Sequence, residues 1–404
     1  MKLLFCVQRY GDGVAGGSES ACRAVAERLA ARGHTVEVVT SRARSYVDWA
    51  DEFPEGESTV SGVRVHRLSV RAPRSPERFG PIHSRIIRQP RAPLYVQRDW
   101  LRLQGPDLPQ LEPWLHDNAR RFDAAIFFTY LYPNAGFGLP VAARYCPTVL
   151  VPTAHDEPTF QLRVFDHAMR TADGIVCLTP EELALVQRRF RFTPNAEVIG
   201  LGVDLHQHGE GNRFRAAYGL GGSFLLLYVG RLDPGKGSDE LYRCFAEYAR
   251  RHPGVKLVVV GEPVAPLPPH PDVVVTGFVD EQTKLDAIAA ANVFVQPSYF
   301  ESFSLALCEA WVMRRAAMVQ GRCAVLAGQA RRSGGALAYR SFAEFAETLH
   351  RLRADDVLRE QLGEAGRRYV VANYDWDAVI TRYEDFVTRI AESWSSPRPQ
   401  YTRR

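Results

Sequence analysis

The sequence predicts an α/β protein made of two doubly wound, Rossmann-like domains that face each other across a cleft. Three observations predict this class. Short apolar runs of strand length alternate with helix-like stretches along the chain, which is typical of parallel sheets covered by helices. The 404 residues are enough for two ordinary domains. A polar, glycine-rich stretch at about 205–222 separates two series of alternation and is interpreted as a linker.

The first series predicts an N-terminal domain over residues 1–205. Helical patterns fall between several of its strand-like runs, as at 18–32 and 181–190. The expected strands are 2–7, 35–40, 63–70, 123–129, 147–152, 174–178 and 196–200.

The second series predicts a C-terminal domain over residues 206–376. Its expected strands are 224–229, 255–260, 273–276, 293–296 and 317–320. The last ten residues, 395–404, are expected to be a frayed tail.

Composition excludes several classes of protein. There is no run of about 18 apolar residues, and the N-terminus lacks the features of a signal peptide, so a cytoplasmic location is expected. The seven cysteines form no C-x-x-C pair, so neither a zinc site nor a disulfide framework is indicated. The net charge of +4 is too small to argue for a nucleic-acid partner.

One segment is strongly basic. Ten arginines and few acids lie between Arg64 and Arg102, interleaved with prolines, aromatic and apolar residues. One interpretation is a long solvated loop. The other is a basic lip that contacts an anionic partner: a lipid-linked acceptor, an acidic sugar or the inner face of a membrane.

The glycine-rich loop after the first strand has two interpretations. Residues 11–16 fit the G-x-G-x-x-G pattern of dinucleotide-binding proteins. No acid follows the second strand to bind a ribose hydroxyl, but Arg42 and Arg44 could bind the 2′-phosphate of NADP. Alternatively, Gly16 and Gly17 allow the backbone to approach another diphosphate, with Ser18 able to cap the next helix.

Two loops of the second half follow strands directly and carry charged residues. Gly230, Arg231 and Lys236 follow the strand at 224–229, and Glu301 and Glu309 follow the strand at 293–296. Ligands of open α/β sheets bind at these strand ends. The two cations alone could be exposed residues of a Gly/Pro turn. An acid such as Glu309, on a largely apolar helix, needs a partner.

Taken together, the motifs resemble those of the retaining, nucleotide-sugar-dependent glycosyltransferases of family 4, which have the GT-B fold. The chain has G-R-L-x-x-x-K-G at 230–237 and P-S-x-x-E-x-F-x-L-x-x-x-E-A at 297–310. Gly16-Gly17-Ser-Glu19, His155-Asp156, Gly202-Val203-Asp204 and Thr276-Gly277-Phe278-Val279 are also similar to the family's motifs, and their order covers nearly the whole chain.

The resemblance implies roles for particular residues. Glu301 would contact the hydroxyls of the donor sugar, and Glu309, eight residues on, the ribose hydroxyls. At a helical rise of 1.5 Å per residue the two lie about 12 Å apart. Backbone N–H groups at the start of that helix would bind the diphosphate between them. The implied donor-binding residues are Gly16, Gly17, Gly230, Arg231, Lys236, Gly277, Phe278, Val279, Glu301, Ser302, Phe303, Ser304, Leu305 and Glu309.

Further roles are implied for the first domain. His155 would lie beside the donor sugar, unless it is a structural histidine, and Asp156 and Glu19 would face the acceptor. The last helix, 377–394, would pack back on the first domain. Where the family has glycines, this chain has Ser302 and Ser304, and Arg314 and Ala316 replace a later Gly and Pro.

The resemblance implies a metal-independent retaining transfer in which Arg231 and Lys236 stabilise the leaving diphosphate, with Glu301 and His155 as the other catalytic candidates. No cofactor or metal is expected. The donor is expected to be a UDP- or GDP-sugar, and the acceptor a sugar, a lipid-linked compound or a small molecule. Alternatives are a sugar-nucleotide epimerase, a phosphorylase, a non-catalytic nucleotide-sugar-binding protein and an NADP-dependent reductase.

Overall fold

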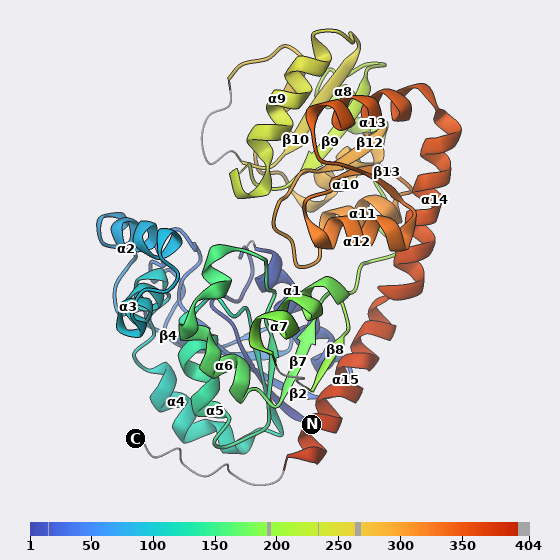
Figure 1. Ribbon diagram of the computed structural model, residues 1–404. Coiled ribbons are helices and arrows are strands. Elements are labelled where there is room, and N and C mark those ends of the chain that lie inside the picture. The colour runs from blue at the N-terminus through green and yellow to red at the C-terminus, as the bar shows by residue number, and fades with distance from the viewer. Residues whose placement is uncertain (15, 192–194, 233, 263–267, 395–404) are drawn as a thin grey trace. The chain divides into compact units, whose positions relative to one another are not determined.

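A computed structural model describes residues 1–14, 16–191, 195–232, 234–262 and 268–394. The chain divides into two compact units (Figure 1). Unit 1 contains residues 1–200 together with the chain from Ile380 onward, and unit 2 contains Leu201–Val379. The expected boundaries, at 205/206 and 376/377, lie within five residues of these divisions. The expected frayed tail, 395–404, lies outside the described residues.

Unit 1 is built on a sheet of eight described strands in the order β3-β4-β2-β1-β5-β6-β7-β8. Neighbours are parallel except for β3 and β4, which form an antiparallel pair. Its strands are β1 (Lys2–Cys6), β2 (Thr35–Ser41), β3 (Gly56–Val60), β4 (Val63–Leu68), β5 (Ala124–Phe128), β6 (Thr148–Val151), β7 (Gly174–Cys177) and β8 (Ala196–Val198).

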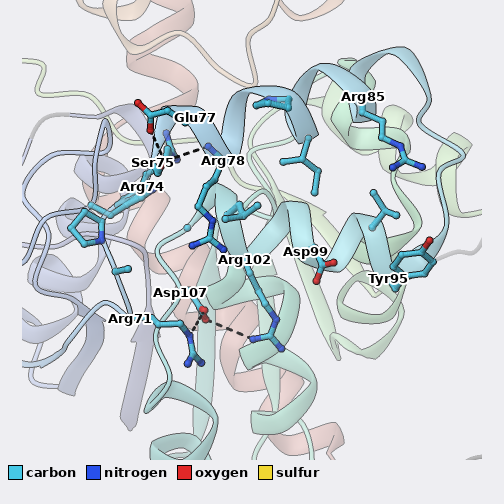
Figure 2. Close-up of a pocket in the computed structure, with 18 residues that line it drawn as sticks. Arg71, Arg74, Ser75, Glu77, Arg78, Arg85, Tyr95, Asp99, Arg102 and Asp107 are labelled. Carbon is cyan, nitrogen blue, oxygen red and sulfur yellow. Dashed lines mark hydrogen bonds and ion pairs between the residues drawn. The ribbon is translucent and has the colours of Figure 1, made fainter.

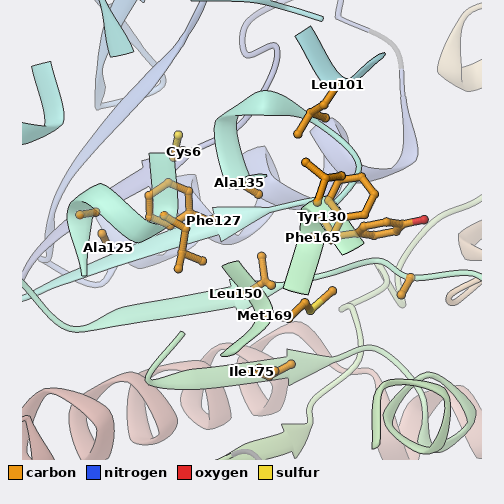
Figure 3. Packing of buried hydrophobic residues seen from close by; sticks show 14 of the residues in the cluster. Cys6, Leu101, Ala125, Phe127, Tyr130, Ala135, Leu150, Phe165, Met169 and Ile175 are labelled. Carbon is orange, nitrogen blue, oxygen red and sulfur yellow. The ribbon is translucent and has the colours of Figure 1, made fainter. Parts of the chain in front are cut away.

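The central strands β5, β6 and β7 of unit 1 are apolar and buried along their length, as expected for a parallel sheet covered by helices. Figure 3 shows part of the core, where Phe127 and Leu150 of adjacent strands pack with Tyr130, Phe165 and Met169. The longer helices are α1 (Gly17–Ala31), α2 (Pro76–Arg88), α3 (Leu94–Gln104), α4 (Leu111–Asn118), α6 (Asp166–Thr171) and α7 (Pro180–Phe190). Short helical turns also occur, including α5 (Leu139–Ala142).

The solvated-loop interpretation of the arginine-rich segment is wrong. Residues 64–102 run through β4, α2 and most of α3. Ser75 caps α2 and Pro76 begins it, which is a favoured arrangement at a helix start. Ile86 and Trp100 are fully buried in the core of unit 1, and this burial fixes the two helices to the domain.

Unit 2 contains a parallel sheet of six described strands in the order β11-β10-β9-β12-β13-β14. They are β9 (Phe224–Val229), β10 (Val255–Val260), β11 (Val273–Val275), β12 (Val293–Gln296), β13 (Ala316–Gln320) and β14 (Ala336–Tyr339). The helices are α8 (Gly211–Ala217), α9 (Ser238–Ala249), α10 (Glu281–Ala290), α11 (Leu305–Val312), α12 (Ala324–Ser333), α13 (Phe342–Ala354) and α14 (Asp356–Asn373).

The expected linker at 205–222 is a packed part of unit 2. Its helix α8 lies against α10. A Cβ atom on Gly209 would come within 2.1 Å of the Leu285 carbonyl oxygen, and one on Gly211 within 2.8 Å of the Ala289 oxygen. These glycines therefore permit close backbone packing, which the sequence pattern did not distinguish from flexibility.

The last helix, α15 (Trp376–Ser393), begins in unit 2 and continues into unit 1. Its Glu384 accepts hydrogen bonds from Arg32 at 2.6 Å and pairs with His34 at 2.8 Å. Arg389 forms an ion pair with Glu197 at 2.5 Å. The helix therefore joins the end of the chain to the first domain.

Candidate functional site

The candidate residues of unit 2 follow the two strands at which its strand order reverses. β9 lies between β10 and β12, and Val293 of β12 is in register with Leu226 of β9. Because both strands are parallel, their carboxyl ends reach the same edge of the sheet. This switch point is where ligands of open α/β sheets bind.

An ion pair joins the two loops at this edge. Nζ of Lys236 lies 2.8 Å from Oε1 of Glu301. The same oxygen accepts a hydrogen bond of 2.9 Å from Nε2 of Gln296, the last residue of β12. The Glu301 side chain is only 10% exposed, whereas that of Lys236 is 35% exposed. The carboxylate is therefore held by two donors, and the ammonium group remains accessible to a ligand.

Glycines permit the close approach of these loops. Gly237 has φ +68°, and a Cβ atom there would come within 2.2 Å of the Pro297 carbonyl oxygen. A Cβ atom on Gly261, after β10, would come within 2.2 Å of the Gly230 oxygen. Arg231 follows Gly230 and is exposed. The backbone after β9 thus comes close to the backbone after β10, where Gly261 permits it, and to the backbone after β12, where Gly237 permits it.

The segment between Glu301 and Glu309 is helical only in its second half. Ser302, Phe303 and Ser304 are buried and precede α11, which begins at Leu305. The assumption behind the expected 12 Å separation is therefore wrong, because only the four steps from Leu305 to Glu309 are helical. Ser304 has φ +82°, a conformation that glycine adopts without strain.

Glu309 has the partner that its apolar helix requires. Oε1 of Glu309 lies 2.9 Å from Nζ of Lys284, on α10, and the two side chains are 14% and 18% exposed. Lys284 also pairs with Glu281 at 2.8 Å. Burial acts to lower the pKa of Lys284, but the carboxylates of Glu309 and Glu281 outweigh it and raise that pKa. Lys284 is therefore positively charged in this pair.

The Gly277-Phe278-Val279 turn follows β11 at the same edge. The Gly277 oxygen accepts a hydrogen bond of 3.0 Å from the Gly261 N–H, which ties the turn to the end of β10. Val279 is half-buried, but the Phe278 ring is 74% exposed. An aromatic face at the carboxyl edge of the sheet is available for stacking by a flat ligand group.

In unit 1, Gly16 and Gly17 lie directly before and at the start of α1, after β1. A Cβ atom on Gly16 would come within 2.4 Å of a Glu19 carboxylate oxygen. That carboxylate accepts hydrogen bonds of 2.9 and 2.5 Å from Arg9, in a pair that is almost fully buried. Glu19, which was expected to face the acceptor, is thus bound to Arg9.

The capping role expected for Ser18 is wrong. Gly16 occupies the N-cap position, and the Ser18 hydroxyl instead donates to Glu19 at 2.8 Å. Ser18 also accepts a hydrogen bond of 3.1 Å from Gln8. The Ser18 hydroxyl therefore bonds to Gln8 and Glu19 and does not cap the helix.

His155 and Asp156 lie in the loop after β6. The His155 side chain is 30% exposed, and its Nδ1 lies 3.9 Å from a Glu157 oxygen. The preceding Ala154 N–H donates to Glu182 at 2.6 Å, and this hydrogen bond anchors the loop. Asp156 is exposed and lies 3.5 Å from Arg188.

Over the part of the chain that is described, no cluster of three or more His, Cys, Asp or Glu side chains has an arrangement that could hold a metal ion. In the same residues, no helix combines the length and the apolar character needed to cross a bilayer.

Two family models match the chain. The model described as Glycosyltransferase Family 4 matches residues 15–207, and the model described as Glycosyl transferases group 1 matches residues 223–355. The chain belongs to glycosyltransferase family 4. It is therefore an enzyme of the glycosyltransferase class with the GT-B fold.

Several bacterial relatives of this glycosyltransferase are named D-inositol 3-phosphate glycosyltransferase. The relative from Nocardiopsis dassonvillei is 27% identical over 93% of the chain and 90% of its own length. The one from Catenulispora acidiphila is 34% identical over 38% of the chain and 41% of its own length. For the relative from Rhodococcus erythropolis, at 31% identity, the match spans 36% of that protein.

Solved structures share the fold of this glycosyltransferase. Sucrose-phosphate synthase from Thermosynechococcus elongatus matches with a TM-score of 0.74 and 19% identity, over 98% of this chain and all of the other. The Anabaena protein HepE in complex with UDP-glucose matches with a TM-score of 0.69 and 15% identity, over 96% of this chain and all of the other.

Sequence reasoning missed three residues of this glycosyltransferase site. Lys284 was given no role in the site, yet it binds Glu309. Gln296 was treated as the end of a strand, yet it donates to Glu301. Gly261 was not singled out, although its position directly after a strand was the one available signal.

Proposed function

We propose that this glycosyltransferase moves a sugar from a nucleoside-diphosphate sugar to an acceptor hydroxyl, with retention of configuration at the anomeric carbon. The observation that carries the proposal is the 2.8 Å contact between Lys236 and Glu301 at the switch point of unit 2. The contact supports the proposal because it brings together a cation suited to a diphosphate and a carboxylate suited to sugar hydroxyls. The cation is needed on the phosphate side of the glycosidic bond that breaks, and the carboxylate on the sugar side.

The diphosphate would bind between the two loops. As the bond between the anomeric carbon and the phosphate oxygen breaks, negative charge grows on that oxygen. Lys236 and the exposed Arg231 would stabilise this charge in advance, together with backbone N–H groups before α11. We therefore propose that the transfer is metal-independent, with these cations in the role that a divalent ion would fill.

The two glutamates would bind the two ends of the donor. Glu301 would accept hydrogen bonds from hydroxyls of the sugar, and Glu309, positioned by Lys284, from hydroxyls of the ribose. The exposed Phe278 ring would stack on the base. A UDP-sugar is the proposed donor, because the solved neighbour HepE is in complex with UDP-glucose.

The acceptor would be deprotonated by the departing diphosphate. Its hydroxyl oxygen forms a bond to the anomeric carbon on the face that the diphosphate leaves, and its proton passes to a phosphate oxygen. The role of His155 stays a prediction.

A thermal-shift panel with UDP, GDP, ADP, TDP and NADP, each with and without EDTA, tests the proposal. A ligand at 100 times its Kd adds about 2.7 kcal/mol to the free energy of unfolding. We expect stabilisation by UDP that is insensitive to EDTA and is lost in Lys236→Ala. Stabilisation by NADP alone, or a requirement for a divalent ion, would overturn it.

A further inference from the structure

We propose that a hollow between α2 and α3 of unit 1 binds the acceptor and that this acceptor carries a phosphate group. The proposal rests on the function proposed above and adds the chemical class of the second substrate. The α2–α3 hollow is lined by these two helices and by residues 71–75, which follow β4 (Figure 2). Its volume is about 970 Å³, large enough for a phosphorylated sugar or polyol.

Positive charge exceeds negative charge in the lining of the hollow. It contains five arginines, at 71, 74, 78, 85 and 102, but only three acids, at 77, 99 and 107. Asp107 is bound by Arg71 at 2.7 Å and lies 3.9 Å from Arg102. Glu77 accepts a hydrogen bond of 2.6 Å from Ser75 at the start of α2. Two of the acids are therefore already engaged.

Arg78 and Arg85 are the two arginines best placed to bind a ligand. Both are exposed, and within the described residues neither guanidinium group has a hydrogen-bond acceptor or an ion-pair partner. Seven residues on a helix amount to about two turns and about 10.5 Å, so the two side chains lie on the same face of α2. Figure 2 shows Arg78 extending from α2 into the space toward α3. A guanidinium fork is suited to two phosphate oxygens.

The rest of the lining suits a carbon skeleton. Ile82 and Val96 contribute apolar surface, and the Tyr95 ring is 68% exposed. Aromatic rings bind the C–H face of sugars and polyols and leave the hydroxyls free. The exposed carboxylate of Asp99 is available to accept hydrogen bonds from those hydroxyls.

The hollow is preformed. The fully buried Gln97 side chain donates to the Ala92 oxygen at 2.6 Å and accepts from the Val164 N–H at 3.1 Å. It therefore ties the connection between the helices to the core. Arg74 lies over the rings of Trp49 and Phe79, at 5.2 and 4.9 Å from their centroids. A ligand would thus find the site already ordered.

A continuous set of contacts joins the hollow to the glycine loop. Arg74 lies over Trp49, and the guanidinium of Arg9 lies 6.0 Å from the Trp49 ring centroid. Arg9 binds Glu19, which lies against Gly16. The side chains of Arg9, Glu19 and Trp49 are buried, so these contacts connect the hollow to the loop before α1 through the interior of unit 1.

The inference is tested by measuring how phosphate-containing probes bind to two matched double variants. The first is Arg78→Gln with Arg85→Gln, and the control is Arg88→Gln with Arg98→Gln. The control carries the same charge change at exposed residues of α2 and α3 that lie outside the hollow. The probes are inorganic phosphate, glucose 6-phosphate and glycerol 1-phosphate by calorimetry. Vesicles of phosphatidic acid in phosphatidylcholine, against phosphatidylcholine alone, are tested by flotation.

We expect at least one phosphate probe to bind the wild type, and the Arg78/Arg85 variant to bind it at least tenfold more weakly while the control is unchanged. Binding of the soluble esters would identify a soluble acceptor, and binding only to phosphatidic acid vesicles a lipid headgroup. The inference is overturned if no probe binds, or if both double variants weaken binding equally. UDP binding to unit 2, measured in parallel, separates this failure from failure of the proposed function.

Discussion

Lys236 and Glu301 lie 65 positions apart in the chain, and their side chains meet at 2.8 Å because β9 and β12 are neighbours in the sheet of unit 2. The cation and the carboxylate restrict each other's position. Each is therefore held in position, as the proposed binding of a sugar diphosphate requires.

Replacing either member of this pair with alanine is expected to reduce transfer by about 10²–10³-fold. Lys236→Ala removes a cation that would stabilise charge on the leaving group, and Glu301→Ala removes the carboxylate that positions Lys236 and would bind the sugar hydroxyls. Steady-state rates for Lys236→Ala and Glu301→Ala measure the effect. Lys256→Ala, which removes a partly exposed lysine paired with Asp272 in the same unit, is the matched control. Wild-type turnover in either site variant would refute the assignment.

Gly237→Ala is expected to lower transfer at least tenfold, because its Cβ atom would meet the Pro297 oxygen at 2.2 Å and force the two loops apart. Gly219→Ala is the control for the backbone strain that any side chain causes at a positive φ. Gly219 also has a positive φ, of +61°, but a Cβ atom there meets nothing within 4 Å. Equal losses of activity in the two variants would show that the close approach is unimportant.

Lys284→Met is expected to raise KM for the donor about tenfold and to change kcat much less. Lys284 acts through Glu309, and loss of the 2.9 Å contact leaves that carboxylate free to turn away from the ribose. Lys256→Met serves as the control. A fall in kcat with an unchanged KM would assign Lys284 a role in the chemical step instead.

Ser304→Gly is expected to raise the free energy of unfolding of unit 2 by about 0.5–1 kcal/mol, since glycine removes the strain of φ +82° at the N-cap of α11. Thermal unfolding of the variant and the wild type measures the difference. A lower melting temperature for the variant would mean that contacts of the serine side chain outweigh the strain.

The ion pair between Asp286 and Arg213 is expected to make stability depend on pH. Hydrogen bonds from Arg213, at 2.5 and 2.9 Å, lower the pKa of Asp286 to about 2. The unfolded chain has a pKa of about 3.9 here. The stabilisation is therefore complete above about pH 5 and is lost as the pH falls toward 2.

Asp286→Asn measures this contribution. We expect the variant to be about 1.5–3 kcal/mol less stable than the wild type at pH 6, and the difference to shrink as the pH falls to 3. Denaturant unfolding at both pH values gives the comparison. A difference that stays constant with pH would contradict the assignment of the depressed pKa to this pair.

The alternation of apolar runs predicted the strands that form the interior of both sheets, because a parallel strand is buried on both faces and leaves a clear apolar signal. It missed β3 and β14. β3 is an exposed edge strand of mostly polar residues, and β14 is only four residues long. Neither carries a pattern that distinguishes it from a loop.

The candidate site was predictable as a set of strand ends but not as a set of contacts. The position of Lys236 directly after one strand and of Glu301 after another could be read from the sequence. That these two strands are adjacent is a property of the crossover topology. For the same reason, nothing local indicated that Lys284 of one helix would bind Glu309 of another.

The arginine-rich segment was misinterpreted for a different physical reason. Its prolines and charges resemble those of a loop, but Pro76 begins a helix and Pro81 lies within it. Gln97 and Trp100 hold α2 and α3 in place because they are buried against distant parts of the chain, and no local sequence pattern reveals this burial.

The two chain segments that begin and end unit 2 lie side by side. The Val203 N–H donates to the Tyr374 oxygen at 2.8 Å, and Gly202 lies against the Trp376 ring. In topological terms the second domain is nested in the first as a single insertion with adjoining ends. A gene rearrangement could thus exchange residues 201–379 as one cassette, or a circular permutation could open the chain elsewhere, without rethreading either sheet. Such an exchange would move the loops of Lys236 and Glu301 together and leave those of Gly16 and His155 in place.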